Sequence, residues 1–513
     1  MRYPIGIQDF QKLRELGYAY VDKTALVYKL ADSGNYYFLS RPRRFGKSLL
    51  LSTFEAYFSG RRDLFEGLAI EKLERQWAKH PILHLDLNTA NYRERGSLYN
   101  VLNDQLAAWE NVYGKSDTEV TPELRFKGIV RRACEQSGER VVILVDEYDK
   151  PLLQAIGDEE LQDEYRDTLK AFYSVLKTQD RYIRFAFLTG VTKFGKVSVF
   201  SDLNNLNDIS MDRRYATLCG ITGAEIHANF ESSLRELAEA CGVTYGEVCD
   251  KLRRMYDGYH FGHDTEGVYN PFSLLNALSK QSFGSYWFET GTPTFLVRLL
   301  QNADYRLDNL QQEQVSADLL GSVDSMSADP LPVIYQSGYL TVKGYDPRFK
   351  VYTLGFPNEE VGEGFMKYLL PFYSPVDENK TDFYIYRFVD DVEKGRPDAF
   401  MGRLQSMLAD SDYRVAGDME KYFQNVLYII FKLMGFYVEV ERATSRGRAD
   451  IVLQTADYVY VIELKLDGSA AEALRQIDER GYAAPFASGS RRVWRIGACF
   501  SSATRGISEW IVE

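Results

Sequence analysis

Short apolar runs alternate with helical patterns over roughly the first 280 residues of the chain. The runs at 36–40, 82–87, 141–145 and 184–188 have the length of buried strands, and the stretches 49–58 and 161–176 show helical spacing of their apolar residues. Strands that alternate with helices favour a parallel sheet covered by helices. We therefore predict an α/β fold for this part.

The pattern changes twice further along the chain. Stretches 223–256 and 272–322 look mostly helical, and 330–400 is mixed and rich in proline and aromatic residues. Beyond residue 400 a second α/β pattern begins, in the order helix, strands, helix and strand. We predict three parts: an α/β domain at 1–220, a mostly helical lid or linker at 221–400, and a second α/β domain at 401–513.

Composition and charge exclude several classes of protein. The chain has 61 Lys and Arg against 73 Asp and Glu, a net charge of −12, so it lacks a basic footprint for nucleic acid over the whole protein. The part from 401 is nearly neutral, with 14 basic and 15 acidic residues, and tolerates a polyanion best. Five scattered cysteines form no CxxC pair. No apolar run approaches the ~20 residues of a membrane span, and no secretory signal is visible. We expect a cytoplasmic protein without a membrane partner.

A candidate phosphate site follows the first strand. The loop at 41–48 reads RPRRFGKS and leads directly into a helix, as a P-loop does. Backbone N–H groups of such a loop face an anion, the lysine reaches the β- and γ-phosphates, and the serine hydroxyl takes Mg²⁺. The loop departs from GxxxxGK[ST] because Arg41 replaces its first glycine. The residues expected to bind ATP here are Arg43, Arg44, Phe45, Gly46, Lys47 and Ser48, with solvent exposure as the alternative for the two arginines.

Carboxylates at the end of a second strand complete this prediction. The segment RVVILVDEYDK places Asp146 where it can hold Mg²⁺, and Glu147 where it can polarise the attacking water. A third strand ends in Thr189, which either senses the γ-phosphate or only caps its strand. Arg213 and Arg214 are candidates for arginine fingers that act in a neighbouring copy, or for ordinary surface residues.

A second group of charged residues lies near the C-terminus. Asp450 opens one strand, and the next strand ends in Glu463-Leu464-Lys465. Side chains alternate along a strand, so Glu463 and Lys465 share a face while Leu464 turns to the core. The two carboxylates, with the carbonyl of Leu464, can bind Mg²⁺, and Lys465 can position a water and stabilise charge on a phosphate. Gln476, on the following helix, would orient Lys465 or the water.

Two further sets of residues extend this candidate site. Glu420, on the helix that begins the domain, could add an outer carboxylate to the metal site. Arginines flank the site on both sides and are candidates for phosphate contacts, with solvated charge as the alternative: Arg442, Arg446, Arg448, Arg491, Arg492 and Arg495.

Together these motifs resemble a bacterial family with an N-terminal AAA-ATPase-like domain and a C-terminal PD-(D/E)XK nuclease-superfamily domain. The resemblance rests on RPRRFGKSLLLST, VDEYDKPL, LNNLNDIS, YDGYHF, YNPFSLLNAL, YWFETGTPTFL, RADIVLQ and VIELK, and covers nearly the whole chain. In that family arginine is usual at the position of Arg41. The resemblance implies an ATP-binding protein with a nuclease domain, and it implies that Tyr20, Asp22 and Lys23 lie near the base or phosphates.

Two functions follow as hypotheses. The first is an ATP-gated, Mg²⁺-dependent nuclease that acts on nucleic acid, with DNA favoured over RNA. The second is a regulatory ATPase whose C-terminal domain only binds nucleic acid or a partner. A homo-oligomer is compatible with both, because such ATPases often place an arginine in a neighbour's site. Cleavage lost in Lys465→Ala would distinguish the two hypotheses.

Overall fold

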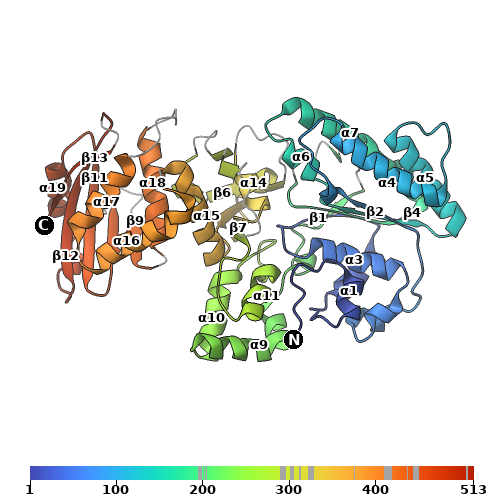
Figure 1. Ribbon diagram of the computed structural model, residues 1–513, viewed down its shortest axis with the longest axis horizontal. Coiled ribbons are helices and arrows are strands. Elements are labelled where there is room, and N and C mark those ends of the chain that lie inside the picture. The colour runs from blue at the N-terminus through green and yellow to red at the C-terminus, as the bar shows by residue number, and fades with distance from the viewer. Residues whose placement is uncertain are drawn as a thin grey trace. The chain divides into compact units, whose positions relative to one another are not determined.

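The computed structural model forms two compact units (Figure 1). It describes all residues except 194–198, 201, 202, 204, 289–295, 298, 301–304, 311, 312, 322–328, 375, 410–418, 436, 443–449, 504 and 505. Unit 1 comprises Met1–Gly291 and Gln311–Val361, and unit 2 comprises Thr292–Leu310 and Gly362–Glu513. The division between the units falls inside the segment predicted as a helical middle part. The three-part division of the sequence stays a prediction.

A five-stranded parallel sheet organises the first half of unit 1. Its order is β2-β3-β4-β1-β5, and its strands are β1 (Tyr36–Ser40), β2 (Ile82–Asp86), β3 (Val141–Asp146), β4 (Ile183–Gly190) and β5 (Asn207–Asp208). Every residue of β3 is buried, as expected for a central strand covered on both faces. The predicted parallel α/β architecture is confirmed, and all carboxyl ends of the strands meet at one edge.

Helices cover both faces of this sheet. Figure 1 shows α1 (Phe10–Glu15) and α3 (Lys47–Phe58) on one face, and α4 (Ser97–Tyr113), α5 (Pro122–Ser137) and α7 (Glu159–Thr178) on the other. α7 begins where the Asp158 side chain accepts a hydrogen bond from the Leu161 backbone, and its apolar stripe packs on α5 through stacked Phe126 and Phe172 rings. The short helices α2 (Thr24–Ser33) and α6 (Lys150–Gln154) precede β1 and follow β3.

The rest of unit 1 combines helices with a small sheet. Capping boxes start α9 (Gly223–Cys241) and α10 (Tyr245–Tyr256), and Asn270 caps α11 (Pro271–Lys280). Beyond them lie α13 (Ala317–Gly321), α14 (Leu331–Gln336) and an antiparallel sheet of order β6-β8-β7, built from Glu313–Ser316, Val351–Gly355 and Thr341–Asp346. The prediction of a mostly helical stretch at 272–322 missed β6, because a four-residue strand shows too little alternation to be recognised without its partner β8.

Unit 2 holds a second sheet and the helices packed on it. The sheet has the order β13-β12-β11-β10-β9, in which β11 and β12 are parallel and the other pairs antiparallel. Its strands are β9 (Glu439–Arg442), β10 (Ile451–Gln454), β11 (Tyr458–Leu466), β12 (Arg492–Ser501) and β13 (Gly506–Val512), and α19 (Ala470–Arg480) connects β11 to β12. The other helices are α16 (Thr381–Glu393), α17 (Pro397–Ala409) and α18 (Met419–Met434), while α15 (Glu359–Tyr373) begins in unit 1. Among the described residues, no helix is both long and apolar enough to cross a bilayer.

Candidate functional site

The loop between β1 and α3 has the geometry of an anion-binding site. Gly46 precedes α3 with a φ of 90°, and Arg44 adopts a φ of 68°, so the chain turns sharply before the helix begins. No side chain among the described residues caps α3, and its first backbone N–H groups are therefore available to a ligand. This loop, together with the strand ends beside it, is called the phosphate site below.

Five of the residues predicted for this site lie together. Lys47 is buried, places Nζ 3.2 Å from Glu147 Oε1, and donates to the carbonyl of Arg41 at 3.0 Å. Ser48 Oγ donates to Asp146 Oδ2 at 2.5 Å, and Thr189 Oγ1 donates to Asp146 Oδ1 at 2.6 Å. β3 and β4 are neighbours in the sheet, which is why residues more than 40 positions apart meet here. The prediction left open whether Thr189 senses phosphate or caps a strand, and its hydrogen bond places it on the carboxylate of Asp146.

Glu147 has a raised pKa and an unfavourable backbone conformation. Burial raises its pKa to about 7, with Lys47 opposing the rise and the charges of Asp149 and Asp146 adding to it. Its φ of 54° lies in the left-handed region, which costs a non-glycine residue about 1–3 kcal/mol. A carboxyl group that titrates near neutral pH suits a general base, since it can accept a proton and release it again.

Arg41 contacts distant parts of the protein, which its position in the loop did not predict. Its guanidinium is buried, donates to the carbonyls of Ser210 and Tyr215 at 2.8 and 3.3 Å, and lies 3.9 Å from the centre of the Phe261 ring. Burial lowers its pKa to about 10, so it remains charged at neutral pH. Arg41 therefore ties the loop to segments far along the chain, and the sequence offered no signal for this.

The other loop residues face different surroundings. The Phe45 side chain is buried against the ring of Tyr259 at 4.7 Å, so only its backbone can contact a phosphate. Arg43 lies over the ring of Trp287, with one terminal nitrogen buried and without a hydrogen-bond partner among the described residues. Arg44 is exposed. Arg43 is thus the better placed of the two arginines to contact a ligand.

An apolar cavity of about 110 Å³, called the apolar pocket below, adjoins the loop. It is lined by Gly46 and Leu49 of the loop and α3, by Tyr20 and Lys23 of the N-terminal segment, and by Phe230 of α9, among others. The family resemblance implied that Tyr20, Asp22 and Lys23 lie near a nucleotide, and two of these residues, Tyr20 and Lys23, line the apolar pocket.

The remaining residues named for this half of the chain have local partners. Asp22 does not line the pocket, because its carboxylate accepts from the backbone of Thr24 and of Ala69. Arg213 and Arg214 are exposed, and Arg214 pairs with Asp212 at 2.5 Å.

The C-terminal residues also form one cluster, called the nuclease-like site below. The antiparallel register pairs Ile451 with Ile462, so Asp450 comes opposite Glu463. Asp450 Oδ2 accepts from the backbone N–H of Leu464 at 2.9 Å, and Glu463 Oε2 accepts from the backbone N–H of Asp450 at 3.3 Å. The arrangement rests on two adjacent strands that are joined by a short turn.

Lys465 and Gln476 complete this cluster. Lys465 Nζ donates to Gln476 Oε1 at 2.5 Å and lies 3.4 Å from Glu463 Oε1, which also accepts from Gln476 Nε2. Glu463 and Lys465 therefore share a face of β11, as predicted. Leu464 is only half-buried rather than in the core, because β11 leaves the sheet interior at this end.

The electrostatics of the nuclease-like site suit a cation. The Glu463 side chain is 3% exposed, and burial together with the charge of Asp450 raises its pKa, while Lys465 lowers it. Two carboxylates held this close gain from a divalent ion with hard oxygen ligands, so the residues fit Mg²⁺. No group of three or more His, Cys, Asp or Glu side chains suited to a metal occurs in the described part of the chain. The side chain of Glu420, predicted as an outer ligand, lies outside the described residues.

The arginines near this site contact other protein groups where they are described. Arg491 donates to Gln454 Oε1 at 2.9 Å, Arg492 lies 3.6 Å over the Trp494 ring, and Arg495 pairs with Glu513 at 2.8 Å. The side chain of Arg442 and the whole of Arg446 and Arg448 lie outside the described residues. Phosphate contacts by these six arginines stay a prediction.

Comparisons with known proteins give a family for each end of the chain. A family model described as a predicted AAA-ATPase matches residues 4–200, and one described as the PD-(D/E)XK nuclease superfamily matches residues 418–510. The chain is 38% identical over 526 residues to a protein of Azotobacter chroococcum mcd 1 described as an uncharacterized protein in the vnfD 5' region, with 100% of this chain and 99% of that protein covered. A solved structure of the Aeropyrum pernix ORC2 protein (ADPNP-ADP complexes) aligns with 70% of this chain and 90% of its own at 13% identity and a TM-score of 0.24. The chain belongs to the family whose members join an N-terminal predicted AAA-ATPase domain to a C-terminal PD-(D/E)XK nuclease-superfamily domain.

Proposed function

We propose that the chain is an ATP-binding ATPase joined to a Mg²⁺-dependent nuclease. The observation that carries the proposal is the convergence of Lys47, Ser48, Asp146 and Glu147 at one edge of the parallel sheet. Lys47 and the N–H groups of α3 would hold the phosphates of ATP, and Ser48 with Asp146 would hold its Mg²⁺. The bound ion would neutralise charge on the phosphates.

The apolar pocket is the proposed place of the base of ATP, as its position and lining suggest. This pocket begins at Gly46 and is lined mainly by apolar side chains, as an aromatic ring requires. Tyr20 and Phe230 offer rings beside it, and Lys23 is held at its edge by Glu225 at 2.6 Å. A phosphate site and a pocket for the base thus adjoin each other on α3.

Hydrolysis would use Glu147 as the general base. In the present arrangement Glu147 is occupied by Lys47, so the ion pair must open before Lys47 can reach a phosphate. Because Lys47 opposes the rise in the pKa of Glu147, moving the lysine to a phosphate would make this carboxylate a stronger acceptor for a proton from water. ATP binding would therefore switch on the base as it engages the lysine.

At the nuclease-like site, Asp450, Glu463 and the carbonyl of Leu464 would hold Mg²⁺, which supplies positive charge for a scissile phosphate of DNA or RNA, DNA being favoured. Gln476 holds Lys465 in place, and Lys465 would orient the attacking water and stabilise negative charge. The regulatory alternative also has support, because Arg491, Arg492 and Arg495 are engaged within the protein and the chain is acidic. In that case the domain binds a partner or nucleic acid without cutting it.

A cleavage assay separates these proposals. The full chain is incubated with DNA and with RNA, with Mg²⁺ or EDTA, and with or without ATP. We expect Mg²⁺-dependent cleavage that Lys465→Ala lowers by about 10²–10³-fold, whereas Lys394→Ala, an exposed lysine paired with Asp390 in the same unit, is unchanged. Equal cleavage by wild type and Lys465→Ala on every substrate excludes catalysis at this site, and binding without scission favours the regulatory role.

Nucleotide binding is tested separately with a fluorescent ATP analogue. Ser48→Ala and Lys47→Ala should each weaken binding, whereas Lys12→Ala, at an exposed lysine of α1, should not. Unchanged affinity in both site variants would refute the assignment of the phosphate site. An ATP-dependent change in sedimentation would support a homo-oligomer.

A further inference from the structure

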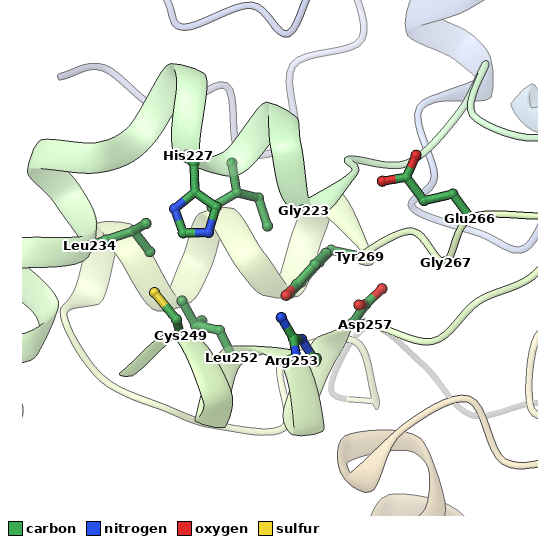
Figure 2. A pocket seen from close by; sticks show the side chains of 11 residues that line it. Gly223, His227, Leu234, Cys249, Leu252, Arg253, Asp257, Glu266, Gly267 and Tyr269 are labelled. Carbon is green, nitrogen blue, oxygen red and sulfur yellow. The ribbon is translucent and has the colours of Figure 1, made fainter. Parts of the chain in front are cut away.

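A second pocket lies in the helical part of unit 1, away from the loop between β1 and α3. It opens between α9, α10 and the segment that follows α10 up to Tyr269, as Figure 2 shows, and has a volume of about 210 Å³. It shares no lining residue with the apolar pocket. Sites for drug-sized ligands occupy about 300–1,000 Å³, so this pocket, called the α9–α10 pocket below, suits a molecule of amino-acid size.

The lining of the α9–α10 pocket carries charged groups of both signs. Figure 2 shows His227 on α9 and Arg253 on α10, with Tyr269 and the carboxylate of Asp257 beside Arg253 and with Glu266 apart from them. Burial raises the pKa of Tyr269 to about 12, so its hydroxyl keeps its proton. With His227 neutral, the formal charge of the lining is −1, one guanidinium against two carboxylates.

One oxygen of the Asp257 carboxylate is left without a hydrogen bond. This oxygen, Oδ1, is buried and has no hydrogen-bond partner among the described residues, while the charges of Arg253, His260 and Lys343 act on the carboxylate as a whole. Burial of a hydrogen-bond acceptor costs free energy unless a donor reaches it. The position of this oxygen therefore points to a ligand that donates a hydrogen bond to it. Residue 267 is glycine, and a Cβ at that position would lie 3.2 Å from this oxygen, so the small residue keeps the approach open.

We propose that the α9–α10 pocket binds a basic α-amino acid of the lysine class. Its carboxylate would pair with Arg253, and its two cationic groups would meet Asp257 and Glu266. The buried side chains of Ile226 and Leu252 provide an apolar floor for the methylene chain. Each charge of the ligand has one opposite charge in the pocket, and the net charge of +1 complements the lining.

The α9–α10 pocket is connected to the apolar pocket through one helix. Glu225 on α9, beside Ile226 of the pocket floor, pairs with Lys23, which lines the apolar pocket. Phe230 on the same helix lines the apolar pocket as well. An amino acid bound against α9 would therefore change ATP affinity, and ATP would change amino-acid affinity by the same factor. This coupling rests on the proposed nucleotide site, whereas the binding of the amino acid does not.

Calorimetric titration of the full chain without nucleotide tests the binding. L-lysine is compared with norleucine, which lacks the side-chain ammonium, and with cadaverine, which lacks the carboxylate. We expect both analogues to bind at least about tenfold more weakly than L-lysine, since each loses one charge-assisted hydrogen bond. Equal affinity for all three, or no binding of L-lysine, would overturn the proposal.

Variants show whether the binding occurs in this pocket. Arg253→Gln and Gly267→Ala should each weaken L-lysine binding by about tenfold or more. Arg254→Gln is the matched control, because it removes the same charge one residue away. Arg254 lies 3.4 Å from Glu359 and does not line the pocket, so this variant should bind L-lysine normally. If Arg254→Gln weakened binding as much as Arg253→Gln, the pocket assignment would be wrong. Affinity for the fluorescent ATP analogue at saturating L-lysine then tests the coupling alone, which an unchanged value contradicts.

Discussion

The phosphate site and the nuclease-like site both place a lysine beside a carboxylate that is at least partly buried, yet they are built differently. Lys47 lies 3.2 Å from Glu147 and its side chain is 3% exposed, while Lys465 lies 3.4 Å from Glu463 and is 30% exposed. The first lysine also donates to a backbone carbonyl, and the second to the side chain of Gln476. Lys47 is therefore fixed in the protein interior, and Lys465 stays accessible from solvent.

The two sites also differ in how much of the chain they need. The phosphate site joins residues from 41 to 189, at the ends of two strands and on the loop that leads into α3, and its loop is anchored by Ser210 and Tyr215. The nuclease-like site needs only residues 450–476, on two adjacent strands and the next helix. A substitution disrupts a site of local contacts only if it changes one of the residues of that site. A site assembled across a sheet also depends on anchors that never contact the ligand.

Arg41→Gly should have the largest effect on stability, although it restores the common glycine of the P-loop pattern. It removes a buried guanidinium that binds the carbonyls of Ser210 and Tyr215, and leaves them unpaired. We expect a loss of at least about 3 kcal/mol in the free energy of unfolding, measured by chemical denaturation.

Arg44→Gly is the matched control for that experiment. Arg44 is exposed and has a φ of 68°, a conformation that glycine adopts without strain, so its removal should be neutral or slightly stabilising. Equal losses in the two variants would mean that Arg41 is not an anchor.

Replacing each of the two lysines by alanine should have the second-largest effect on stability and should distinguish the two sites. Lys47→Ala leaves the partly buried Glu147 without its cation and removes a buried lysine, and should cost about 2 kcal/mol more than Lys465→Ala, whose lysine is partly solvated. Thermal unfolding of both variants gives the difference. The added change Glu147→Gln should recover part of the stability lost in Lys47→Ala. A larger loss in Lys465→Ala would contradict the contrast between a fixed and an accessible lysine.

Magnesium should stabilise the nuclease-like site in the absence of ATP. At a concentration ten times its Kd, Mg²⁺ should stabilise the folded protein by about 1.4 kcal/mol, seen as a higher thermal midpoint than in EDTA. Glu463→Gln should abolish the shift because it removes a ligand of the ion. Asp457→Asn, at an exposed position of the same unit, should retain it. A shift that persists in Glu463→Gln would place the ion elsewhere.

The smallest expected effect concerns pH and the ion pair of His84 with Glu55. Burial alone would lower the pKa of His84, but its hydrogen bond to Glu55 at 3.0 Å and nearby carboxylates raise it above the ordinary value. A raised pKa in the folded state stabilises the fold below the ordinary pKa of about 6.5, and this gain is lost as the pH rises through the folded value. His84→Gln should therefore cost up to about 1 kcal/mol more at pH 5.5 than at pH 9. Glu55→Gln should show the same trend, and a loss that grows with pH would reverse the assignment.

Much of the fold could be predicted from the local pattern of apolar and polar residues. Buried runs ending in Asp146 and Thr189, and a loop leading into a helix at Lys47, predicted the parallel sheet and the meeting of these residues, because the carboxyl ends of parallel strands share one edge. The i, i+2 spacing of Glu463 and Lys465 likewise predicted a shared face. The sheet of β6, β7 and β8 was not foreseen, since a short strand acquires its identity from a partner far along the chain.

By itself the sequence determined the types of element and predicted most of the residues that meet at the two candidate sites, because periodicity and spacing act over a few residues. Only the tertiary structure decided that Arg41 is a buried anchor, that Phe45 packs on Tyr259, and that Asp257 Oδ1 has no hydrogen-bond partner within the described part of the chain. Those outcomes depend on which distant segments fold against each residue, and burial of a polar group is a property of that whole environment rather than of its neighbours in the chain.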